Sequence, residues 1–82
     1  MTEEFTNVIY ALDELRNDTG VPKSIKSKIG EMINALSNSG NDDSILVNKL
    51  LNELDDISTD INLQPFVRTQ IFNISGMLET FN

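Results

Sequence analysis

The fold is decided by residues 25–36, IKSKIGEMINAL, in which apolar side chains recur every three or four positions. An α-helix turns once in about 3.6 residues, so these side chains share one face. The positions on this face are Ile25, Ile29, Met32, Ile33 and Leu36. The spacing predicts a helix with one apolar stripe, which must pack against other helices.

Three further segments carry the same spacing. The predicted stripes are Phe5, Val8, Ile9, Leu12 and Leu15; then Val47, Leu50, Leu51, Leu54 and Ile57; then Val67, Ile71, Ile74, Leu78 and Phe81. Gly20 and Pro22 separate the first two helices, Ser39-Gly40 and residues 41–43 the second and third, and Pro65 opens the fourth. No segment alternates with the period of a strand. We predict an all-α protein of four helices.

The two halves of the chain align without gaps at a shift of 42 residues. This shift superimposes apolar positions throughout, and it pairs Asp18 with Asp60 and Lys26 with Arg68. We predict one domain, residues 1–82, with internal repeats at about 3–40 and 43–82 that arose by duplication. The repeated unit resembles the HEAT-type helical repeat. Two repeats are few for a solenoid, so we expect a closed four-helix bundle of two tandem antiparallel hairpins.

Over nearly its full length the chain resembles an archaeal group, uncharacterised protein family 0147. The residues that carry the resemblance are Leu12, Leu15, Asp18, Thr19, Val21, Pro22, Ile25, Lys26, Asp60, Arg68, Thr69, Ile71, Phe72, Asn73, Ile74, Leu78 and Glu79. Three positions depart from the family pattern. Lys26 replaces an arginine, Phe72 replaces a tryptophan, and Gln64-Pro65 has its proline one place late, which we expect to shift a helix start. The resemblance implies a compact four-helix protein of an archaeal cytoplasm, without an assigned activity.

Composition excludes several classes of function. The 82 residues include 6 basic and 13 acidic side chains, and neither cysteine nor histidine. Phosphate backbones and anionic lipids repel such a chain, so nucleic acids and membranes are disfavoured partners. Three lysines, Lys23, Lys26 and Lys28, are the candidate exception for weak nucleic-acid binding. The polar, acidic start and the lack of a long apolar run lead us to expect a cytoplasmic protein.

The aspartates of the repeated turns are candidate site residues. Asp18 and Asp60 each precede a basic residue, Lys26 or Arg68, by eight positions. They could bind a metal ion or a basic partner as a pseudo-symmetric pair. Alternatively, each caps the following helix or pairs with its basic residue. We favour the structural role, because capping explains both copies.

Phe72 points about 140° away from the stripe of its own helix. Its neighbours on that back face, Thr69, Ser75 and Gly76, are small enough to let another helix approach. These four residues form a candidate protein interface. The competing interpretation, which we slightly prefer, places Phe72 inside the bundle over Gly30, its equivalent under the 42-residue shift.

We therefore predict a small non-catalytic protein that binds an unknown protein partner or itself, as in a homodimer. No catalytic, metal-binding or cofactor-binding residue is predicted, and the chain is not expected to be an enzyme. The alternative is a carboxylate-dependent metal-binding protein or enzyme that uses only carboxylates, lysine and Ser/Thr hydroxyls, and its support is the acidic second half of the chain. The densest acidic cluster, Glu53, Asp55 and Asp56, we interpret as a solvated helix face, because adjacent helical residues diverge by about 100°.

Overall fold

The computed structural model describes residues 3–38 and 44–81, and over these ranges the chain forms four helices without a strand. They are α1 (Glu3–Arg16), α2 (Lys23–Asn38), α3 (Ser44–Ser58) and α4 (Pro65–Glu79). The all-α prediction is confirmed. The predicted stop at Ser39-Gly40 and the turn at 41–43 lie outside the described residues.

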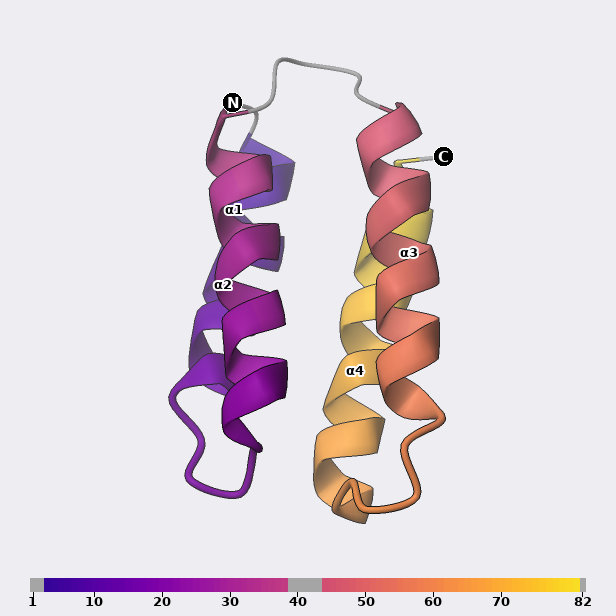
Figure 1. Ribbon diagram of the computed structural model, residues 1–82. Coiled ribbons are helices and arrows are strands. Elements are labelled where there is room, and N and C mark those ends of the chain that lie inside the picture. Colours follow the sequence, from indigo (N-terminus) through magenta and orange to yellow (C-terminus); the bar gives the residue numbers. More distant parts are fainter. Residues whose placement is uncertain (1–2, 39–43, 82) are drawn as a thin grey trace.

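The helices form two hairpins that lie side by side (Figure 1). The first hairpin joins α1 to α2 and the second joins α3 to α4, and α2 ends at the same end of the bundle at which α3 begins. Within the described chain, α1 packs on α2 and α4, and α3 packs on α4 and α2, while the Cα atoms of the diagonal pairs stay more than 8 Å apart. This is the compact helical bundle that the sequence predicts.

The core consists of apolar side chains that are 5% exposed or less. Its members in the first hairpin are Phe5, Val8, Leu12, Leu15, Val21, Ile25, Ile29, Met32 and Leu36. Its members in the second are Val47, Leu50, Leu54, Ile57, Leu63, Val67, Ile71, Ile74 and Leu78. Each residue of the first set lies 42 positions before one of the second. The halves thus share one pattern of burial, although their origin by duplication and the likeness to HEAT repeats stay predictions.

The two hairpins also begin their second helices at equivalent places. α2 begins at Lys23 and α4 at Pro65, which are 42 residues apart. The carbonyl oxygens of Pro22 and Gln64 accept the first backbone hydrogen bonds of these helices at 3.0 and 3.1 Å. The expected shift of a helix start is therefore wrong. Proline is tolerated at either position, because the first residues of a helix have no partner for their N–H groups.

The first and last helices meet at the end of the bundle where α1 begins. The rings of Phe5 and Phe81 lie 4.8 Å apart between centroids, at an interplanar angle of 59°. Tilted aromatic pairs of this kind are favourable. Among the described residues, no helix is long and apolar enough to cross a bilayer.

Candidate interaction site

The turn aspartates stabilise the turns themselves. Oδ1 of Asp18 accepts a hydrogen bond from the Gly20 amide at 2.8 Å, and Oδ1 of Asp60 accepts one from the Asn62 amide at 2.9 Å. Both amides precede the following helix, so the prediction that the aspartates cap that helix is wrong. A short carboxylate side chain bonds most easily to the backbone two residues ahead, which closes an Asx turn.

The basic residues of the repeat behave differently in the two hairpins. Arg68 donates from Nε to the carbonyl oxygen of Ser58 at 2.9 Å and from Nη2 to the carbonyl oxygen of Asp60 at 2.8 Å. It thereby binds the end of α3 and not the Asp60 carboxylate, contrary to the predicted ion pair. The ammonium of Lys26 makes no such bond within the described chain.

The four residues of the candidate interface all lie on the outer side of α4. Phe72 is 56% exposed, and Thr69 and Gly76 are exposed as well. Ser75 is half-buried at the boundary with α3. A Cβ atom added to Gly76 would meet no atom within 4 Å, so this surface is open.

The interpretation that placed Phe72 over Gly30 is wrong. The two residues belong to α4 and α2, which are diagonal in the bundle, with no Cα atoms within 8 Å of each other. The nearest neighbour of a Cβ atom added to Gly30 would be Nη1 of Arg16, at 3.8 Å. Gly30 and Phe72 therefore lie on two separate outer surfaces.

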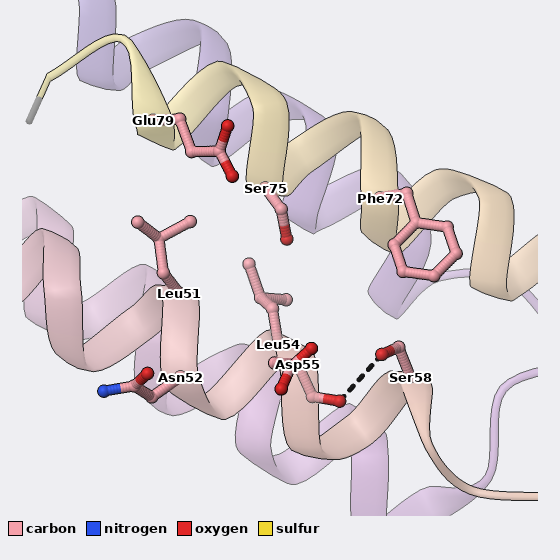
Figure 2. Close-up of a pocket in the computed structure, with 8 residues that line it drawn as sticks. All are labelled: Leu51, Asn52, Leu54, Asp55, Ser58, Phe72, Ser75 and Glu79. Carbon is pink, nitrogen blue, oxygen red and sulfur yellow. Dashed lines mark hydrogen bonds between the residues drawn. The ribbon is translucent and has the colours of Figure 1, made fainter.

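A groove with a volume of about 390 Å³ lies between α3 and α4 on the outer side of the second hairpin (Figure 2). We call it the α3–α4 groove. Its lining consists of Leu51, Asn52, Leu54, Asp55, Ser58, Phe72, Ser75 and Glu79. The hydroxyl of Ser58 donates to the carbonyl oxygen of Asp55 at 2.7 Å and is thus satisfied within its own helix. Apolar side chains, an aromatic ring and two carboxylates therefore border one hollow.

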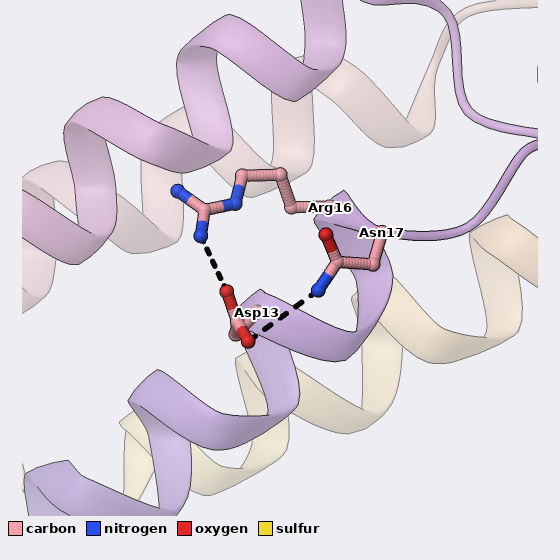
Figure 3. Close-up of polar contacts among 3 residues, drawn as sticks. All are labelled: Asp13, Arg16 and Asn17. Carbon is pink, nitrogen blue, oxygen red and sulfur yellow. Dashed lines mark hydrogen bonds and ion pairs between the residues drawn. The ribbon is translucent and has the colours of Figure 1, made fainter.

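The corresponding surface of the first hairpin is occupied by its own side chains (Figure 3). The Arg16 guanidinium forms a short ion pair with Asp13, and Asn17 donates to the other oxygen of Asp13 at 3.4 Å. The same guanidinium lies over Gly30 of α2. A long cationic side chain thus crosses from α1 toward α2.

The acidic cluster and the lysines do not form the sites considered for them. Asp55 lines the α3–α4 groove, whereas Glu53 and Asp56 face a hollow between α2 and α3. Lys28 and Glu31 line that same hollow, so Lys28 lies among carboxylates. Lys23 and Lys28 are about 140° apart around α2. Across residues 3–38 and 44–81, no three acidic side chains gather as a metal site would require.

Comparison with known proteins places the chain in a family. The model of an uncharacterised protein family, UPF0147, matches residues 1–81. The chain belongs to this family. A UPF0147 protein of Methanosarcina acetivorans is 32% identical over 78 residues, which cover 95% of this chain and 80% of that protein. A UPF0147 protein of Methanocaldococcus jannaschii is 34% identical, covering 94% and 83%.

A solved structure from the same family has the same fold. The crystal structure of a UPF0147 protein from Thermoplasma acidophilum superimposes with a TM-score of 0.87 at 29% identity. The match covers 96% of this chain and 93% of that one. The predicted family is therefore confirmed, its relatives named here are archaeal, and its description assigns no function.

Proposed function

We propose that this UPF0147 chain is a non-catalytic protein-interaction module whose binding face is the outer side of α3 and α4. The observation that carries the proposal is Phe72, a large aromatic side chain that is 56% exposed on the wall of the α3–α4 groove. Exposed aromatic residues beside a hollow are typical anchors of protein interfaces. Ser75 and Gly76, which are small, leave room for a partner helix at that point.

A protein partner fits this surface better than the alternatives do. The groove is bordered by Asp55 and Glu79, and no basic side chain lines it. Such a surface repels phosphate, which argues against nucleic acid. The lack of histidine and cysteine in the chain supports the non-catalytic assignment. We expect the module to act in the cytoplasm, bound to another protein or to a second copy of itself.

The test is affinity capture of the tagged protein from native cell extract, with Phe72→Glu as the variant. Sedimentation velocity of the purified protein measures self-association in parallel. Tyr10→Glu is the matched control, because Tyr10 is 66% exposed and lies on the first hairpin. Both substitutions affect exposed side chains, so the helical circular dichroism signal should be retained.

We expect a stoichiometric partner, or a dimer, that disappears with Phe72→Glu and persists with Tyr10→Glu. The same proteins recovered with both variants, together with an unchanged sedimentation coefficient, would overturn the proposal. Phe72→Ala, which adds no charge, separates loss of the ring from repulsion by the new carboxylate.

A further inference from the structure

The two hairpins carry different side chains at equivalent outer positions. Arg16 and Ile33 of the first hairpin correspond to Ser58 and Ser75 of the second. Two large side chains are thus replaced by two small ones, both of which line the α3–α4 groove. The smaller side chains at Ser58 and Ser75 leave room for the groove between the two helices, while Phe72, which is larger than its equivalent Gly30, forms part of its lining.

Arg16 shows which kind of side chain this surface accommodates. Its guanidinium binds the Asp13 carboxylate and covers Gly30 on the neighbouring helix. A guanidinium is planar and carries several donors, so it combines a charged hydrogen bond with close packing. The equivalents of Asp13 and Gly30 are Asp55 and Phe72, and both line the groove.

The second hairpin has a carboxylate, Asp55, at the position of Asp13, but it has a serine, Ser58, at the position of the cationic Arg16. Asp55 makes no side-chain hydrogen bond or ion pair with the described residues. Glu79 supplies a second carboxylate to the same groove, and Phe72 supplies an exposed ring. A carboxylate beside an aromatic ring favours arginine over other side chains, because a guanidinium can bind the first and stack on the second.

We propose that the α3–α4 groove binds an arginine side chain of a partner protein, with its guanidinium on Asp55 and against Phe72. The bound arginine would occupy the place that Arg16 fills in the first hairpin. Leu51 and Leu54 would contact its aliphatic stem. This inference rests on the proposed function and names the chemistry of the partner.

The first test uses N-acetyl-arginine amide as the probe. The probe is titrated into ¹⁵N-labelled protein, and the amide chemical shifts are followed by NMR. N-acetyl-citrulline amide is the control, since citrulline has nearly the same shape without the charge. We expect saturable shifts at Asp55, Ser58 and Phe72, with at least tenfold weaker binding of citrulline. Equal shifts from both compounds, or shifts confined to other surfaces, would overturn the inference.

Variants locate the carboxylate that binds. Asp55→Asn should weaken binding of the arginine probe at least tenfold. Asp13→Asn makes the same chemical change at the equivalent position of the first hairpin, and it should leave binding unchanged. Equal effects of the two variants would contradict the assignment.

A second pair of variants fills the groove with larger side chains. Ser58→Arg places an arginine at the position equivalent to Arg16, and Ser75→Ile restores the bulk of Ile33. Each should abolish probe binding while leaving helical content intact. If Ser58→Arg lowers helical content, Ser75→Ile alone carries this test. Undiminished binding to a folded variant would overturn the inference.

The captured partner separates the two proposals. If Phe72→Glu releases the partner but Asp55→Asn and Ser75→Ile do not, the interaction module stands and the arginine site fails. If the arginine probe binds the groove but Phe72→Glu changes neither capture nor sedimentation, the proposed function fails and only the chemistry of the groove stands.

Discussion

The first and second hairpins bury the same positions and expose different surfaces. All core residues correspond at a shift of 42, from Phe5 with Val47 to Leu36 with Leu78. The outer faces, in contrast, differ in the size and charge of their side chains. One face is covered by Arg16 in an ion pair, and the other opens into a groove beside Phe72.

This contrast shows where a small helical protein can change without losing its fold. In a domain of this size, a single substitution in the core can remove a large fraction of the free energy of unfolding. Substitutions on an outer face usually alter stability by less than about 0.5 kcal/mol. The difference between the hairpins thus lies in individual outer side chains, because their core positions correspond throughout.

The largest expected effect concerns the two equivalent core leucines. Leu12 and Leu54 are both fully buried, but Leu54 borders the groove. We expect Leu12→Ala to lower the free energy of unfolding by about 4 kcal/mol and Leu54→Ala by about 2 to 3, since a site next to a groove relaxes more easily. Urea denaturation followed by circular dichroism measures both. Leu→Met at each position is the control and should cost less than about 1.5 kcal/mol; equal losses for the two alanine variants would remove this distinction between the hairpins.

The next effect distinguishes the two basic residues at the turns. The Arg68 guanidinium donates hydrogen bonds to two backbone carbonyl oxygens. Within the described chain, Lys26 donates none to the two equivalent carbonyl oxygens, those of Arg16 and Asp18. Arg68→Ala should cost about 1 to 2 kcal/mol, since charged donors to the backbone are worth more than neutral ones, and partial exposure reduces this value. Lys26→Ala should cost less than about 0.5 kcal/mol. A Lys26 variant as unstable as the Arg68 variant would show that the two turns are held alike.

A smaller effect is expected from the turn aspartates. Asp18 is half-buried and Asp60 is exposed, although both bond an amide two residues ahead. We predict that Asp18→Ala costs about 1 kcal/mol and Asp60→Ala about 0.5 kcal/mol, because water replaces a lost bond more readily at an exposed site. Asparagine at either position keeps the acceptor and should be nearly neutral in the same urea experiment. The reverse order of the two losses would contradict this explanation.

The smallest effect is a gain. Lys26→Arg gives the first hairpin the donor that Arg68 supplies to the second, where the equivalent acceptors are the carbonyl oxygens of Arg16 and Asp18. We expect stabilisation by about 0.5 kcal/mol, measured as a rise in the thermal midpoint of a few degrees. The matched change Arg68→Lys should lower the midpoint. No rise with Lys26→Arg would mean that the first turn differs in backbone geometry as well as in sequence.

Much of this architecture was predictable from periodicity. The spacing of Ile25, Ile29, Met32 and Leu36 identifies a helix and its buried face, because burial of one face of an α-helix imposes a period near 3.6. Val21 and Leu63 were missed as core residues, since they lie in turns where no period applies. The 42-residue shift pairs them, and this pairing was the available signal.

The arrangement of helices and the groove were harder to predict. The 42-residue shift pairs Phe72 with Gly30, but neither this shift nor the periodicity of each helix states which helices are diagonal. The groove depends on Ser58 and Ser75, whose small size is noticeable only beside Arg16 and Ile33. Size differences at equivalent positions, rather than motifs, were the signal for this site.

The contact between Phe5 and Phe81 has a consequence for chain connectivity. Because α1 and α4 are neighbours, and the start of α1 lies beside the end of α4, a short peptide inserted between Phe81 and Glu3 could join these two helices (Figure 1). Opening the chain between Asn38 and Ser44 would then yield a circular permutant in which the hairpins follow each other in reverse order. Since the two hairpins bury side chains at equivalent positions, we expect the permuted chain to fold into the same four-helix bundle.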